Sequence, residues 1–300
     1  MKKAFYTDAS AFRQALESRL NATAQKQGVD VQRLRRQVAF DRLLCRLFHL
    51  DNAPWLLKGG YAMELRLEES RTTRDIDLTS RRTIGGRGKL QERILRLLQD
   101  AAAEDLNDFF HFAIANPVKD LAGAPYGGAR YPVEARMDGR IFARFHLDVA
   151  TGDLVLDPVD AVRGHDWLDF AGMRTVPFPT ISTEQQFAEK LHAYTLPRKD
   201  QVNMRFRDLL DMFLLVRAGL DAERVRKAVV SIFERRATHQ VPLTMPLPPE
   251  EWVSPFSELA SECGVTVTLM EAYHHVERFL SKQGVLLRLI PLVSGSCDSD

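Results

Sequence analysis

The sequence has no run of about 18 apolar residues, the length that a helix needs to cross a bilayer. The N-terminus, MKKAFYTDAS, carries two lysines but no apolar segment, so it does not resemble a secretory signal. Three cysteines occur in 300 residues, at Cys45, Cys263 and Cys297, and no CxxC pair is present. These spacings exclude a disulfide framework and a zinc knuckle. We therefore expect a cytoplasmic protein with no membrane partner.

Net charge is almost absent too, because 41 basic and 40 acidic residues leave a formal charge of +1. A sum near zero does not exclude a nucleic-acid partner, since binding responds to the local field. Eight lysines and arginines fall between Arg71 and Arg96, a local concentration suited to a phosphate backbone. The apolar fraction of 45% argues against a wholly disordered chain.

The order of patterns along the chain predicts two different lobes. Helical periodicity over 11–27 and 31–48, with Ser10 and Asp30 as the expected N-caps, precedes short apolar and alternating segments typical of strands. Residues 151–182, rich in Asp, Pro and Gly, are expected to be a connection with short strands. The pattern from Thr183 onward is helical. We predict an α+β protein, with a mixed-sheet lobe over 1–182 and an all-helical lobe over 183–300.

A β-hairpin is predicted around Asp138-Gly139, because this dipeptide separates two alternating segments, 131–137 and 140–150. In the second segment, alternation is expected to place four side chains on one side: Phe142, Arg144, His146 and Asp148.

Two aspartates in the segment Asp75-Ile76-Asp77-Leu78 are the first candidate site residues. Residues i and i+2 of a strand share a face and lie roughly 6–7 Å apart. Two carboxylates so placed repel each other unless a cation lies between them, and Mg²⁺ prefers such ligands together with substrate phosphates. Two solvated aspartates on an edge strand are the simpler alternative.

The Gly59-Gly60 pair follows a predicted strand and opens a helix, so its backbone N–H groups could approach a phosphate. By itself the pair indicates only a tight turn. A third acid, Asp148, would complete a two-metal phosphoryl-transfer site, with Asp153 and Asp157 as competing candidates. A strand-end aspartate of no functional role is equally compatible with the pattern.

The helical lobe adds Lys190, which could reach triphosphate oxygens as a point charge. Asp208 and Asp211 share a face of the next predicted helix, and Asp211 could hold Lys190 or a ribose hydroxyl. Taken singly, each of these three residues is explained as well by a surface ion pair of no functional role.

Four segments, taken in this order and spacing, resemble the nucleotidyltransferase superfamily and, within it, the AbiEii/AbiGii toxin family with its MenT-like toxins. They are Leu57-Lys58-Gly59-Gly60, Arg71-Thr72-Thr73-Arg74-Asp75-Ile76-Asp77-Leu78, Glu189-Lys190-Leu191 and Arg207-Asp208-Leu209-Leu210-Asp211. The resemblance spans residues 40 to 216. The family often has Arg-Phe-Ser-x before the aspartate pair, and Thr73 keeps a hydroxyl in this stretch.

The resemblance implies a nucleotidyltransferase-like N-terminal lobe and a role for each matching residue. Catalysis would rest on Asp75, Asp77, Lys190 and Asp211. Nucleotide binding would involve Lys58, Gly59, Gly60, Thr73, Arg207 and Asp208. Mg²⁺ would be bound by Asp75 and Asp77, with Asp148 as the third candidate ligand.

The resemblance also implies a toxin of a toxin–antitoxin or phage-defence system. Such a toxin would transfer nucleotides from an NTP to RNA, at the 3′ end of the tRNA acceptor stem, and block translation. Its partner would be a winged-helix antitoxin encoded nearby. Two alternatives stay open: a nucleotidyltransferase acting on a small molecule such as an aminoglycoside, and a degenerate module that binds a nucleotide or an antitoxin without catalysis.

Overall fold

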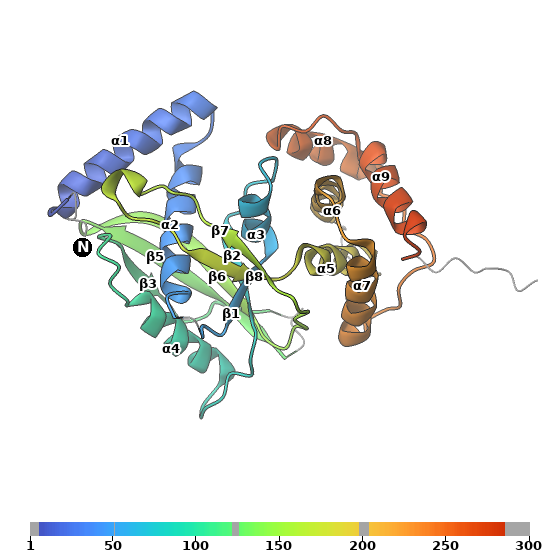
Figure 1. Cartoon of the computed structure of the whole chain (residues 1–300), viewed down its shortest axis with the longest axis horizontal. Helices are drawn as coiled ribbons and strands as arrows, with labels where there is room; N and C mark the ends of the chain where they lie inside the picture. Colours follow the sequence, from blue (N-terminus) through green and yellow to red (C-terminus); the bar gives the residue numbers. More distant parts are fainter. Residues whose placement is uncertain (1–5, 51, 122–125, 198–203, 286–300) are drawn as a thin grey trace, which may run out of the picture. The chain divides into compact units, whose positions relative to one another are not determined.

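The computed structural model describes residues 6–50, 52–121, 126–197 and 204–285. The chain forms two compact units, Met1–Ser182 and Thr183–Asp300. Figure 1 shows the helices and strands of both units. Within the described residues, no helix has the length and apolar character needed to span a bilayer.

The first unit combines helices with an eight-stranded sheet. Its helices are α1 (Ala9–Gln27), α2 (Val31–Leu47), α3 (Gly59–Arg66), α4 (Leu90–Ala102) and the short 3₁₀ turn η1 (Asp169–Ala171). Its strands are β1 (Trp55–Lys58), β2 (Asp75–Ser80), β3 (His111–Ile114), β4 (Lys119–Asp120), β5 (Gly128–Met137), β6 (Arg140–Ala150), β7 (Asp160–Arg163) and β8 (Pro177–Thr180).

The sheet is mixed, with strand order β3-β5-β6-β2-β1-β8-β7 and β4 paired to β5. Strand β2 runs parallel to β6, and β1 runs parallel to β8, whereas the other pairs are antiparallel. The predicted α+β class with a mixed sheet is therefore confirmed. The short strands expected between 151 and 182 are β7 and β8, and they extend the sheet beyond β1.

One face of the central strands is buried against α2 and α4 (Figure 1). The ring of Phe40 on α2 lies 4.8 Å from that of Phe145 on β6, and the Tyr131 hydroxyl on β5 donates to the backbone of Gln91 in α4. Ile76 of β2 is fully buried on the same side. Because side chains of a strand alternate, the neighbours of these residues in sequence project from the other face.

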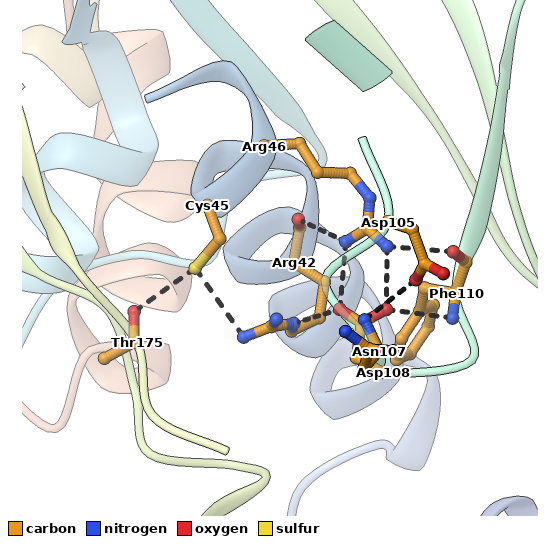
Figure 2. A network of polar contacts seen from close by, with 8 residues as sticks. All are labelled: Arg42, Cys45, Arg46, Asp105, Asn107, Asp108, Phe110 and Thr175. Atoms are coloured by element: carbon orange, nitrogen blue, oxygen red, sulfur yellow. Dashed lines mark hydrogen bonds and ion pairs between the residues drawn. The ribbon is translucent and has the colours of Figure 1, made fainter. Parts of the chain in front are cut away.

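A buried ion-pair network joins α2 to the segment before β3 (Figure 2). Asp108 is completely buried and accepts hydrogen bonds from Arg42 at 2.6 Å and from Arg46 at 2.7 and 2.9 Å. Burial alone would raise the pKa of Asp108, but the two guanidinium groups outweigh burial and lower it. The network fixes the helix that covers the sheet. Burial raises the pKa of the neighbouring Cys45 thiol, which makes it an unreactive core residue.

Two details differ from the sequence predictions. Asp8, not Ser10, caps α1, since its carboxylate accepts hydrogen bonds from the Ser10 and Ala11 amides. Asp30 caps α2 as predicted. The β5–β6 pairing contains a bulge, so Phe142 is buried in the core whereas Arg144 is exposed. The prediction that Phe142 shares a side with Arg144 is therefore wrong.

The second unit is helical in its described residues. It comprises α5 (Thr183–Thr195), α6 (Phe206–Ala218), α7 (Ala222–Arg236), the 3₁₀ turn η2 (Glu250–Trp252), α8 (Val253–Glu262) and α9 (Leu269–Lys282). Helix α5 packs against α6 and α7, and α6 packs against α8 and α9. Asp221 caps α7, and Thr268 with Glu271 forms a capping box at α9. The interior is apolar, with Phe187, Leu191 and Phe256 fully buried.

Candidate active site

Four charged side chains stand in one row across four neighbouring strands of the first unit. In the strand register, Lys58 of β1 is the partner of Asp77, Asp77 of β2 is the partner of Asp148, and Asp148 of β6 is the partner of Arg130 on β5. Neighbouring strands lie about 4.8 Å apart. Cross-strand partners project from the same face, so the row reads positive, negative, negative, positive on the face opposite the helices.

Arg130 connects two of the predicted metal ligands. Its Nε and one terminal nitrogen each donate to Asp148 at 2.8 Å, and the same terminal nitrogen donates to Asp75 at 3.2 Å. The hydrogen bonds to Asp148 and the surrounding carboxylate charges raise the pKa of Arg130, so it stays a cation at every accessible pH. His146 Nδ1 lies 3.3 Å from the other oxygen of Asp75.

Lys58 occupies the other end of the row. Its ammonium group is 2.5 Å from the Asp153 carboxylate, whose side chain is almost fully buried. Asp153 therefore holds the lysine beside Asp77. Asp157, the other competing acid, has a side chain 75% exposed and pairs with Arg81 at 3.3 Å. Its exposure makes it a surface residue of the described structure.

Asp77 lies in the surroundings that most disfavour a bare carboxylate, because it combines burial with two acidic neighbours. Burial raises its pKa to about 6, and the negative charges of Asp148 and Asp75 add to the rise. The charge of Lys58 and a hydrogen bond from the backbone N–H of Gly60 act in the opposite direction without cancelling it. A carboxylate in this condition favours either a proton or a cation at neutral pH.

The glycine pair is required by how closely Asp77 and Thr73 approach it. Gly59 has φ +69°, and a Cβ built there would lie 2.0 Å from an Asp77 carboxylate oxygen. A Cβ on Gly60 would lie 2.8 Å from the Thr73 hydroxyl. Both residues begin α3, whose N-terminal amides carry partial positive charge. The turn thus presents the backbone to the carboxylate of Asp77, and the same amides suit a phosphate.

Thr73 fixes the segment that leads into β2. Its hydroxyl donates to the carbonyl of Asp75 at 3.1 Å, and its backbone N–H donates to Glu64 at 3.4 Å. Glu64 is itself held by Gln37 at 2.6 Å and Arg33 at 3.3 Å. Through this chain of contacts, helices α2 and α3 set the position of the first aspartate.

The second unit contains the other predicted residues in one cluster. Lys190 on α5 lies 2.5 Å from Asp211 and 3.5 Å from Asp208, both on α6. The side chains of Lys190 and Asp211 are 10% and 1% exposed, so the pair is buried rather than superficial. Arg205 donates to the far oxygen of Asp208 at 3.0 Å. Arg207 is exposed, with its guanidinium 5.8 Å from the Phe206 ring, and does not join this cluster.

The predicted residues therefore fall into two groups. The first unit brings together Lys58, Gly59, Gly60, Thr73, Asp75, Asp77 and Asp148, and the second brings together Lys190, Asp208 and Asp211. Sequence reasoning missed Arg130. Arg130 lies one residue before the predicted hairpin segment 131–137, whereas the observed strand β5 begins at Gly128 and includes it.

The carboxylates on β2 fit a divalent cation. Asp75 and Asp77 share a face and carry excess negative charge, and Mg²⁺ typically binds through one or two carboxylates plus substrate phosphates. Among the residues that the structure describes, no group of three or more His, Cys, Asp or Glu side chains gathers as a metal site. These residues therefore fit a divalent ion that is held by two protein carboxylates and takes its remaining ligands from elsewhere, such as substrate phosphates.

Exposed basic residues flank both ends of β2. Arg74 precedes the strand and is exposed, and Arg81 and Arg82 follow it. The loop 85–89 and the first turns of α4 add exposed Arg87, Lys89 and Arg96. Half-buried Arg93 instead donates to the carbonyls of Ile84 and Gly86, so it shapes this loop.

Comparison with known proteins is consistent with this architecture. MenT4, a nucleotidyltransferase toxin from Mycobacterium tuberculosis, is similar in structure, with a TM-score of 0.55 and 15% identity over 90% of this chain and 98% of that chain. JHP933 from Helicobacter pylori has a TM-score of 0.47 and 16% identity over 86% of this chain and 97% of its own. Among curated proteins, none matches this chain significantly in sequence.

The likeness to MenT4 shows a shared fold. The sequence profile described as the nucleotidyl transferase AbiEii toxin of type IV toxin–antitoxin systems matches residues 42–276, more than half of the chain. The matched range contains both clusters of predicted site residues. The chain belongs to the AbiEii family of nucleotidyltransferase toxins, and a toxin of a type IV system has an antitoxin as its counterpart.

Proposed function

We propose that the protein is a cytoplasmic, Mg²⁺-dependent toxin that transfers nucleotides from an NTP to the 3′ acceptor end of tRNA and so blocks translation. The observation that carries the proposal is the set of three aspartates on the face of the sheet opposite α2 and α4. Asp75 and Asp148 both contact Arg130, Asp77 is the strand partner of Asp148, and Asp77 lies against the glycine turn. A site with this charge and these ligands suits phosphoryl transfer.

Asp75 and Asp77 would hold Mg²⁺, which supplies neutralisation of charge on the phosphates when bound. The backbone amides of Gly59 and Gly60, with Lys58 and Thr73 beside them, would receive the triphosphate. Lys190 would contact phosphate oxygens, with Asp211 and Asp208 holding its ammonium group in place. Arg207 is exposed and free of the lysine cluster, so its predicted contact would be with the nucleotide directly.

In the proposed reaction a ribose hydroxyl of the RNA attacks the α-phosphorus of the NTP. One P–O bond forms, the bond from the α-phosphorus to the bridging oxygen breaks, and pyrophosphate leaves. The hydroxyl proton is released to solvent. The chain's residues contribute by orienting the two substrates and by balancing charge.

An RNA acceptor is supported by the exposed arginines and lysine around β2. They are distributed from Arg74 to Arg96, and the two ends of β2 are roughly 17 Å apart at 3.3 Å per residue. A polymer with repeating phosphates can contact basic residues spread over such a distance. The counterpart antitoxin is proposed to be a winged-helix protein encoded nearby.

The proposal is tested by incubating the protein with each labelled NTP, Mg²⁺ and total tRNA. We expect one or more NTPs to label tRNA, and Asp77→Asn to reduce labelling roughly 100-fold or more. Asp157→Asn is the matched control, because Asp157 is an exposed aspartate with a surface ion pair. It should retain wild-type labelling.

Three other results would each overturn part of the proposal. No labelling of RNA by any NTP removes the RNA-transfer activity. Antibiotic resistance on expression, without growth arrest, would instead indicate transfer to a small molecule such as an aminoglycoside. Growth arrest that persists in Asp77→Asn would indicate a toxin that acts without catalysis.

A further inference from the structure

We propose that Arg130 takes the place of a second divalent cation in this site, so that the protein binds one ion where three carboxylates would otherwise hold two. The inference rests on the proposed function, because it concerns the ion expected at Asp75 and Asp77. Arg130, which lies outside the sequence motifs, thereby gains a role at the site. Asp148 becomes the partner of Arg130 and is no longer a metal ligand.

The first argument is geometric. Arg130 reaches both oxygens of Asp148, each at 2.8 Å, and one oxygen of Asp75 at 3.2 Å. The guanidinium thus supplies positive charge to both carboxylates, the service a second cation would otherwise perform there. Arginine presents its donors in a planar fork that matches a carboxylate, so the two bonds to Asp148 are mutually reinforcing. An incoming ion would have to displace a bidentate pair to bind Asp148.

The second argument is charge balance. Counting only carboxylates, lysine and arginine, the strand register and the ion pairs join four acids, Asp75, Asp77, Asp148 and Asp153, to two cations, Lys58 and Arg130, and His146 lies beside Asp75. Two negative charges remain, which equals one divalent cation. Without Arg130 three would remain, more than one divalent cation neutralises, and both oxygens of Asp148 would be available to a second ion.

The third argument comes from the strand register. Arg130 is the direct cross-strand partner of Asp148, and Lys58 is that of Asp77. Lys58 is held by Asp153, whereas Arg130 turns both its Nε and a terminal nitrogen toward Asp148. The two aspartates thus have different partners. Asp148 accepts two hydrogen bonds from Arg130, whereas the cation opposite Asp77, Lys58, is itself paired with Asp153.

Counting bound Mn²⁺ tests the proposal without relying on catalysis. Full-length protein is titrated with Mn²⁺ alone, and the free ion is followed by its electron paramagnetic resonance signal. We expect one Mn²⁺ per chain for the wild type, one for Arg130→Lys, which keeps the charge, and two for Arg130→Gln. Asp148→Asn should leave the count at one, whereas Asp77→Asn should reduce it to zero.

Arg136→Gln is the matched control. Arg136 also lies on β5 and also makes two hydrogen bonds to one carboxylate, that of half-buried Glu134, at 2.6 and 3.1 Å. Arg136→Gln should still bind one Mn²⁺ per chain. A thermal unfolding scan with and without Mn²⁺ establishes that Arg130→Gln is folded, and the ion should raise its midpoint more than that of the wild type.

Two Mn²⁺ ions in the wild type, or a single ion in folded Arg130→Gln, would overturn the role of Arg130. Absence of Mn²⁺ binding in the wild type would also overturn it, and would remove the metal from the proposed function. Labelling of tRNA is measured separately, so an active protein with two ions would refute only the role of Arg130.

Discussion

Asp77 and Asp148 are direct neighbours on two parallel strands, with their side chains on the same open face of the sheet. Like charges opposite each other on neighbouring strands are destabilising. The fold offsets this repulsion with a cation on each side, Lys58 beside Asp77 and Arg130 beside Asp148. Burial, with the charges of Asp148 and Asp75 added to it, nevertheless raises the pKa of Asp77 to about 6.

The raised pKa of Asp77 predicts that its ionisation weakens the metal-free fold. A carboxyl whose pKa is higher in the folded chain contributes stability that is fully present below its unfolded pKa, near 4, and is lost as pH rises through about 6. Asp77→Asn removes this loss, so we expect it to raise the free energy of unfolding at pH 8 by up to about 3 kcal/mol. Urea unfolding in EDTA at pH 4, 6 and 8 measures the difference, which should grow with pH. A variant less stable than the wild type at pH 8 would contradict the charge imbalance.

Gly59→Ala is expected to disturb the site as well as the turn. The substituted Cβ would lie 2.0 Å from the Asp77 carboxylate, at a φ of +69°. Gly139→Ala is the matched control, since Gly139 has φ +68° with no atom within 4 Å of its built Cβ. The control should cost only the backbone strain, about 1–2 kcal/mol. Gly59→Ala should cost more and should abolish Mn²⁺ binding, as measured by urea unfolding and ion titration. Equal losses of stability in the two variants would show that Asp77 can move away freely.

Substitutions in the buried pair of Lys190 and Asp211 can separate the contribution of Lys190 to stability from its contribution to catalysis. Lys190→Met leaves the almost fully buried carboxylate of Asp211 without this cation and should cost about 3–5 kcal/mol. Adding Asp211→Leu removes the uncompensated charge and should restore most of the stability. Labelling of tRNA should stay low in the double variant, because the phosphate contact is still missing. A double variant with wild-type labelling would limit Lys190 to a structural role.

RNA binding should weaken steeply with salt if the exposed basic residues contact phosphates. Each lost phosphate contact lowers the slope of log affinity against log salt by roughly 0.7–0.9. Arg82→Gln combined with Arg87→Gln should therefore lower the slope by about 1.5. Both residues are exposed. Fluorescence anisotropy with labelled tRNA between 50 and 300 mM salt measures the slope of log affinity against log salt.

The control for the salt experiment is Arg136→Gln with Arg144→Gln, two arginines that share Glu134 on another part of the sheet. This pair should leave the slope unchanged. Binding that is indifferent to salt in the wild type would contradict a phosphate-contacting surface.

The sequence by itself determined the local features of the site. Alternation along Asp75-Ile76-Asp77-Leu78 places the aspartates on one face and buries Ile76 and Leu78, because the side-chain period of a strand is two. The glycine pair, the hairpin at Asp138-Gly139 and the mixed-sheet class also follow from short-range patterns. The family resemblance added the order of the motifs, and the match over 42–276 confirms the family.

Tertiary structure alone decided which charges meet. Counting back from the Met137–Arg140 pair of a regular hairpin would place Arg130 opposite Leu147, a core residue. The bulge at Phe142 shifts the register by one residue and brings Arg130 opposite Asp148. A shift of one residue changes every cross-strand partner beyond it, and no local pattern of the sequence encodes it. Long-range strand pairing likewise made Asp77 the neighbour of Asp148, because these residues are far apart in the chain and meet only through the sheet.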